Sequence, residues 1–261
     1  MSEELKFGRK PRTYDPRIPH LSTVLAEKER PPPPAAVDHT KTATAQLPAE
    51  LGMMLNNKLQ NCTCAAYYHG RQVWTFQTTG SPSTEPDSNV ELLYELACGY
   101  KPSTAGEGPA GGAQQVLKFL RKEGAPLGPG GKVREKLTAF LEVDPHNIDD
   151  VKRTVFECGV AYVGMNVPQN VIPKDSAPPA VWSVDPHDPK IVEGHAVVVA
   201  GYDDAGATLI SWGRHYKMTW EFFVKYVDEV YAIADHAWIS AKHRTPGGLS
   251  LPQLEELMRR L

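Results

Sequence analysis

One cysteine and one histidine stand where their side chains could act together as a nucleophile and a base. Cys62 lies at or next to the start of a predicted helix over residues 62–77, and the partial positive charge of a helix N-terminus stabilises the thiolate, the nucleophilic form of cysteine. His195 opens an almost wholly apolar run that ends at Tyr202, which predicts a buried strand. Taken alone, His195 fits a core histidine with satisfied polar atoms, whereas a thiol beside it would make the ring a general base.

The other three cysteines are weaker candidates for a catalytic or metal-binding role. Cys64 follows Cys62 by two positions, a rotation of about 200° on a helix, so only one of the two can face a given cleft. Cys98 and Cys158 are expected to be small, buried apolar side chains. A Cys-x-Cys pair without a second pair is a poor zinc signal, so we expect neither a metal nor a cofactor.

The composition and the net charge limit the class of protein in which these residues can lie. The chain has 261 residues, of which 41% are hydrophobic and 23% charged, as in a folded protein with a sizeable core. The formal net charge of −3 gives no reason to expect nucleic acid or an anionic membrane as a partner. No apolar run reaches the roughly 18 residues of a membrane span, and the N-terminus has no signal-peptide core. We therefore expect a cytoplasmic protein with reduced thiols.

The chain divides into three parts. Residues 1–36 form a basic, proline-rich arm, which favours extended backbone and either trails in solvent, drapes over the body or docks a protein partner. Residues 37–240 form the body, and residues 241–261 a glycine hinge followed by a short amphipathic helix. That helix either packs back on the body or engages another chain. Its apolar face is made of Leu254, Leu257, Met258 and Leu261.

The body is predicted to have helices first and an antiparallel sheet second, an α+β order. The sequence favours helices over 62–77, 88–98, 112–122 and 147–158, with Ser88 and Asn147 as N-caps. A weak alternation suggests a strand within 133–143. Stronger patterns predict strands over 160–167, 195–202, 207–212 and 230–239, and one short helix at 219–226.

Three short motifs make the chain resemble the papain-like cysteine peptidase superfamily. Residues 34–39 are similar to the family's Pro-x-x-Val-Asp-Trp strand, and residues 61–65 to its nucleophile helix. Residues 194–202, followed by Ser-Trp-Gly at 211–213, resemble its histidine strand and its Asn-Ser-Trp-Gly strand. The Gly-His-Ala-Val sequence and the Met-Thr-Trp at 218–220 are similar to those of uncharacterised bacterial and phage members.

The resemblance implies a helical half packed against a sheet half, with an active-site cleft between them. Cys62 would be the nucleophile and His195 its base. Asn56, six residues before Cys62, would stand where the family has a glutamine that donates to the oxyanion, together with the Cys62 backbone N–H. The alternative register makes Cys64 the nucleophile and puts Lys58 in the place of that glutamine, a poor match for a neutral amide.

The family's third residue, an asparagine that orients the histidine, has two candidate positions here. Alignment on Trp-Gly gives Ile210, which could not orient a ring, while the family's usual interval from His195 gives Ser211, whose hydroxyl could. Trp212 would shield the hydrogen bond from water. Gly194, Asn61 and Thr63 would line or support the cleft. The family's paired cysteine before the nucleophile is absent, so no matching disulfide is expected.

The function implied is that of a thiol hydrolase acting on an amide bond of a peptide or protein. One alternative is a weak or inactive papain-like domain used for binding or assembly, in a phage-related or virion-associated role, for which the arm and the tail helix would supply contacts. Another is a transferase or amidase that uses the same pair on a different substrate. An arm lying in the cleft would indicate a self-blocked, zymogen-like state.

Overall fold

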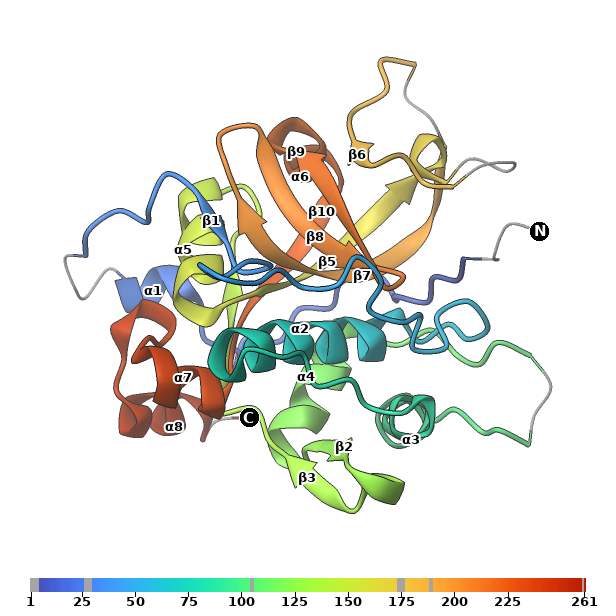
Figure 1. Ribbon diagram of the computed structural model, residues 1–261, viewed down its shortest axis with the longest axis horizontal. Helices are drawn as coiled ribbons and strands as arrows, with labels where there is room; N and C mark the ends of the chain where they lie inside the picture. Colours follow the sequence, from blue (N-terminus) through green and yellow to red (C-terminus); the bar gives the residue numbers. More distant parts are fainter. Residues whose placement is uncertain (1–4, 26–29, 104–105, 173–176, 188–189, 260) are drawn as a thin grey trace.

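A helical half and a sheet half pack against each other in the computed structural model (Figure 1). The structure describes residues 5–25, 30–103, 106–172, 177–187, 190–259 and 261, so parts of the predicted arm, at 1–4 and 26–29, lie outside the described residues. The helical half contains α2 (Cys62–Thr79), α3 (Asp87–Cys98), α4 (Ala113–Lys122), and the two-stranded ribbon of β2 (Ala125–Leu127) and β3 (Val133–Glu135). The predicted α+β organisation is confirmed.

The other half is built on an 8-stranded sheet, in which strands run in the order β4-β10-β5-β7-β8-β9-β6 and β1 also pairs with β7. All its pairs are antiparallel except β6 with β9. The strands are β1 (Val37–Asp38), β4 (Ala139–Val143), β5 (Ala161–Pro168), β6 (Val181–Trp182), β7 (Ile191–Tyr202), β8 (Gly206–Ser211), β9 (Arg214–Thr219) and β10 (Val227–Ala234).

Helix α2 joins the two halves, because it lies across β7 (Figure 1) and is buried along most of its length. Gly70 allows this close packing: a Cβ there would already lie 3.4 Å from the Val160 side chain. The Trp74 indole N–H donates to the Cys158 carbonyl at 2.7 Å, which fastens the C-terminal part of α2. The helix ends at Gly80 with a φ of 85°, a left-handed conformation that glycine adopts without strain.

Apart from α1, the remaining helices begin at side-chain caps. Asn147 accepts from the backbone of Asp150, Thr219 from Phe222 and Ser250 from Gln253, as expected of good N-cap residues. The tail helix packs back on the body, with Leu254 and Met258 buried. These helices are α1 (Leu21–Leu25), α5 (Ile148–Cys158), α6 (Trp220–Tyr226), α7 (His236–Lys242) and α8 (Leu251–Met258). Among the described residues, no helix has both the length and the apolar character needed to cross a membrane.

Three local predictions are wrong. Residues 133–143 form two strands, β3 and β4, which belong to different sheets. Residues 230–239 do not form a single strand, because Asp235 caps the backbone N–H of Trp238 and starts α7. Helix α3 starts at Asp87 with Pro86 in the N-cap position, so Ser88 lies inside the helix.

Candidate active site

Cys62 is the first residue of α2, at the boundary between the two halves. Its side chain is buried, with 1% exposed. The backbone N–H of Ala196, the residue that follows His195 on β7, acts on the Cys62 thiol and lowers its pKa. The helix that begins with the predicted nucleophile therefore packs on the strand that carries the predicted base, far away in the sequence.

The histidine ring is held by Ser211. Its Nε2 lies 2.8 Å from the Ser211 Oγ, and its Nδ1 is buried without a hydrogen-bond partner among the described residues. The register between β7 and β8 explains why Ser211, and not Ile210, can orient the ring. Val198 pairs with Ile210, and alternate residues point to opposite faces, so Ser211 shares a face with His195 while Ile210 points away.

Trp212 covers the imidazole on one side. The two rings stack with centroids 4.3 Å apart and planes 18° from parallel. Trp212 has a φ of 46°, an unfavourable left-handed conformation for a bulky residue. The chain can turn here because Gly213 follows: a Cβ on Gly213 would lie 2.4 Å from the Gly52 carbonyl oxygen. The strained turn places the indole over the ring that Ser211 orients.

Asn56 and Asn61 lie in and beside a strained turn before α2. Met54 and Leu55 both have positive φ, 51° and 64°, and the Asn61 amide stabilises the turn by donating to the Met54 carbonyl at 2.8 Å. The Asn61 side chain does not cap α2. Asn56 is buried, and its amide donates to the Leu59 carbonyl at 3.2 Å. In this form the predicted oxyanion donor is engaged within its own turn.

Thr63 and Cys64 are buried behind Cys62. The Thr63 carbonyl accepts from the Tyr162 hydroxyl at 2.8 Å, so Thr63 supports α2 from behind. The Cys64 thiol interacts with that of Cys98, the last residue of α3. All four cysteines are free thiols.

The N-terminal arm crosses the site between the two halves. Phe7 packs edge-on against both His195 and Trp212, with ring centroids 5.6 and 5.8 Å apart. The Trp212 indole N–H donates to the Lys6 carbonyl at 2.9 Å. Gly8 and Arg9 follow, and the Arg9 N–H donates to the Gly194 carbonyl at 3.1 Å. The arm thus drapes over the body and covers the imidazole.

Gly194 and Gly8 permit this close approach. A Cβ on Gly194 would lie 2.3 Å from the Arg9 carbonyl oxygen, and one on Gly8 would lie 2.1 Å from the Gln60 carbonyl oxygen. The sequence-based reasoning identified Gly194 but not Phe7, Gly8 or Arg9. The sequence indicated only that the arm is basic and extended. It could not indicate where the arm docks, because docking depends on residues far away in the chain.

Burial keeps the sulfur and the ring uncharged in this form. It raises the pKa of the Cys62 thiol to about 12, although the Ala196 N–H and the positive charge of Arg9 act in the other direction. Burial, together with the charges of Arg9 and His69, lowers the pKa of His195 to about 3. Desolvation disfavours the charged form of each group, so the pair is thiol and neutral imidazole. Within the described residues no group of three or more His, Cys, Asp or Glu side chains could hold a metal ion.

No protein-family model matches the sequence, and no curated protein matches it significantly. Solved structures do match. Xylellain, a cysteine protease from Xylella fastidiosa, has a TM-score of 0.64 at 16% identity, over 89% of this chain and 97% of that one. A procathepsin B from Trypanosoma congolense has a TM-score of 0.57 at 12% identity, over 88% and 87%. Procathepsin L 3 from the larval midgut of Tenebrio molitor has a TM-score of 0.53 at 12% identity, over 78% and 71%. Together with the motifs around Cys62 and His195, these likenesses show that the chain has the fold of the papain-like cysteine proteases.

Proposed function

We propose that this chain is a papain-like thiol hydrolase that cleaves a peptide bond with Cys62 and His195, and that residues 6–10 keep the form described here in a blocked, zymogen-like state. One observation carries the proposal. The backbone N–H of Ala196, next to His195, acts on the Cys62 thiol, while Ser211 holds Nε2 of His195 and leaves Nδ1 without a hydrogen-bond partner among the described residues. This arrangement supports a nucleophile, a base and a residue that orients the base.

The chemistry follows from these three residues. With the cleft open, a proton passes from the Cys62 thiol to His195, and the thiolate attacks the carbonyl carbon of the substrate. The Cys62 backbone N–H, which has no acceptor within α2, and the Asn56 amide, once turned from Leu59, would stabilise the oxyanion. His195 gives its proton to the leaving amine. Water, deprotonated by His195, then hydrolyses the thioester and restores the thiol.

The blocked state is supported by the packing of Phe7. Its ring lies against both His195 and Trp212 and excludes water from the imidazole, and so disfavours the thiolate–imidazolium pair that the attack requires. The Arg9 backbone occupies the rim at Gly194, where a substrate backbone would also have to bind. Displacing the arm would expose Cys62 and His195 to water and would also free the backbone at Gly194 for a substrate.

A full-length double variant, Phe7→Ala/Arg9→Ala, tests the proposal. We expect Cys62 in this variant to react with iodoacetamide near pH 6 at least tenfold faster than in the native chain, and the variant to hydrolyse peptides. Mass spectrometry locates the alkylated residue, and Cys62→Ser must abolish both signals. The matched control is Tyr14→Ala/Arg17→Ala, which also removes one aromatic side chain and one arginine, but from an exposed part of the arm.

A binding or assembly module is the second candidate. It is favoured by the replacement of the orienting amide by the Ser211 hydroxyl, which fixes a ring less firmly, and by the occupied cleft. The same double variant separates the two functions. Slow, equal labelling of all four thiols, without hydrolysis of any peptide, would overturn the hydrolase and leave the binding module.

A further inference from the structure

Arg9 is held in an acidic pocket next to the candidate active site. Its side chain is fully buried. Its Nη1 donates to Glu229 at 2.7 Å, and its Nη2 donates to Asp228 at 3.0 Å and to Asn166 at 3.3 Å. Glu229 is itself buried, with 1% exposed. A buried guanidinium is stable only when it is paired and hydrogen-bonded in this way, so these three side chains form a specific receptor for it.

The pocket is shaped for a long side chain. Gly164 on β5 pairs with Glu229 on β10, and a Cβ on Gly164 would lie 2.8 Å from the Arg9 Cδ and 2.5 Å from Glu229 Oε1. The missing side chain at Gly164 therefore makes the room that the arginine stem occupies. The Tyr231 hydroxyl donates to Glu229 Oε2 at 2.8 Å, which holds that carboxylate in place independently of Arg9.

The backbone around Arg9 is held by contacts that any peptide could make. The Gly111 N–H donates to the Gly8 carbonyl at 2.7 Å, the Lys10 N–H donates to the Gly111 carbonyl at 3.0 Å, and the Arg9 N–H donates to Gly194. Gly111 on one side of the arm and Gly194 on the other thus bind an extended main chain whatever its sequence. Selection must come from the side chain that enters the pocket.

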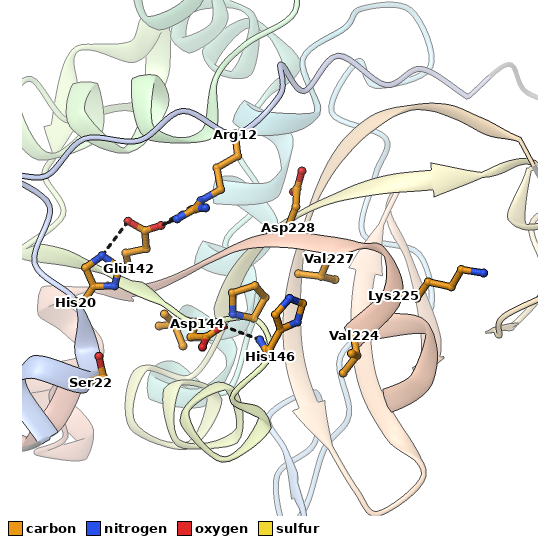
Figure 2. A pocket seen from close by; sticks show the side chains of 12 residues that line it. Arg12, His20, Ser22, Glu142, Asp144, His146, Val224, Lys225, Val227 and Asp228 are labelled. Atoms are coloured by element: carbon orange, nitrogen blue, oxygen red, sulfur yellow. Dashed lines mark hydrogen bonds and ion pairs between the residues drawn. The ribbon is translucent and has the colours of Figure 1, made fainter.

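Further carboxylates lie beyond the pocket. A cavity of about 530 Å³ has Asp228, Glu142 and Asp144 in its lining, beside the basic side chains of Arg12, His20, His146 and Lys225 (Figure 2). The arm's own Arg12 binds Glu142 there, as Figure 2 shows, although Glu142 is only 2% exposed. Two arginines three residues apart on one extended segment thus meet successive carboxylates of the body. When the arm leaves, both sets of carboxylates lose their arginine partners.

We propose that the pocket of Glu229, Asp228 and Asn166 is a substrate subsite that selects an arginine side chain in an extended, basic peptide. The inference rests on the proposed function, since it names the substrate class of that same cleft. Arg9 occupies the subsite in the blocked form, and an arginine of the substrate replaces it, with its backbone against Gly111 and Gly194. The carboxylates around Arg12 favour a second basic residue further along the peptide.

The test uses the full-length Phe7→Ala/Arg9→Ala chain and peptides that carry arginine or citrulline at each of the four positions before the cleaved bond. Citrulline keeps the shape of arginine and removes its charge. We expect kcat/KM for arginine to exceed that for citrulline by about tenfold or more at one position only. Adding Asp228→Asn/Glu229→Gln should abolish the preference there, since the glutamine that replaces Glu229 can still accept from Tyr231 and the pocket keeps its shape.

Controls and binding separate this inference from the proposed function. Glu255→Gln/Glu256→Gln removes two adjacent exposed carboxylates from α8 and should leave the preference intact, and thermal unfolding checks that each variant is folded. Affinity for the same peptides is measured in the Cys62→Ser background. Hydrolysis without any preference for arginine overturns the subsite and leaves the hydrolase. Preferential binding of arginine without hydrolysis supports the subsite and overturns the hydrolase, while the absence of both overturns both.

Discussion

The Ser211 hydroxyl lies 2.8 Å from Nε2 of His195 and leaves Nδ1 without a hydrogen-bond partner among the described residues. A neutral imidazole has one donor and one acceptor nitrogen, and the bond made by one nitrogen fixes the role of the other. With Ser211 accepting from Nε2–H, Nδ1 carries the lone pair that a base needs. The hydroxyl can therefore replace an amide in this role, provided that it does not itself donate.

We predict that Ser211→Ala in the Phe7→Ala/Arg9→Ala background lowers kcat more than it raises KM, because the ring loses its orientation while the substrate contacts remain. The variant should also lose about 1–3 kcal/mol of unfolding free energy, since it leaves a buried ring nitrogen unpaired. Steady-state kinetics and urea denaturation measure the two effects.

Ser211→Thr is the matched control, because it keeps the hydroxyl and should recover most of kcat. If Ser211→Ala lost stability but kept kcat, Ser211 would be a structural residue alone, and the orienting role proposed here would be wrong.

The pH profile of alkylation gives a second prediction. Burial raises the pKa of the Cys62 thiol to about 12 in the blocked form, so at pH 7 only about one molecule in 10⁵ carries the thiolate. The rate of Cys62 alkylation in the native chain should rise about tenfold per pH unit from pH 7 to 10. In Phe7→Ala/Arg9→Ala, hydrated Cys62 and His195 form an ion pair, and the rate should be nearly flat above pH 6. A parallel rise in both proteins would contradict the blocking role of the arm.

Gly8 offers a third prediction. A Cβ at this position would lie 2.1 Å from the Gln60 carbonyl oxygen, and its φ of 117° is strained for any other residue. Gly8→Ala should therefore push the arm out of the cleft and increase the alkylation rate of Cys62 several-fold at pH 7, as measured by mass spectrometry.

Gly80→Ala is the matched control for Gly8→Ala. Gly80 also has a positive φ, of 85°, but a Cβ there meets nothing within 4 Å. This control should cost about 1 kcal/mol of stability at the end of α2 and leave the alkylation rate unchanged. Equal rates in the two variants would mean that destabilisation, rather than displacement of the arm, exposes Cys62.

Local signals were enough to predict the frame of the site. The cap at Asn147 and the apolar run that ends at Tyr202 each act within a few residues, and the corresponding α5 and β7 form as predicted. The pairing of Ser211 with His195 depends on register between β7 and β8, which the sequence left open between two positions. Strand β9 was missed because its exposed face carries charged side chains, and its pairing with β8 supplies the stability that its own sequence does not.

The contents of the cleft could not be predicted, because they depend on contacts between distant residues. Arg9 and Glu229 are 220 residues apart, and neither lies in a distinctive local pattern. Proline and basic residues made the arm look extended, which is correct, but extension alone does not determine where a segment docks. The room at Gly164 and the paired carboxylates are visible only once β5 and β10 lie side by side.

Buried histidines make acid stability a fourth prediction. Burial lowers the pKa of His195 to about 3 and those of His39 and His69 to about 4. Below pH 6.5 the unfolded chain binds protons at these rings that the folded chain does not bind, so unfolding becomes easier as the pH falls from 6.5 towards 4. Asp235, whose pKa burial raises to about 6, acts in the opposite direction, as do Asp150, Glu157 and Glu229, whose pKa values burial also raises, so the contribution of a histidine is measured by substitution.

His69→Gln isolates one of these contributions. The Gln side chain does not titrate, so the loss of unfolding free energy between pH 7 and pH 5 should be about 2 kcal/mol smaller than in the native chain, as measured by urea denaturation at both pH values. His187→Gln, at an exposed histidine, should leave the loss unchanged. An unaltered loss in His69→Gln would mean that His69 binds its proton at the same pH in the folded chain as in the unfolded chain and is charged at pH 5. A charged ring would then lie in the buried core of α2, seven residues after Cys62, and its field would favour the Cys62 thiolate that the blocked form is proposed to suppress.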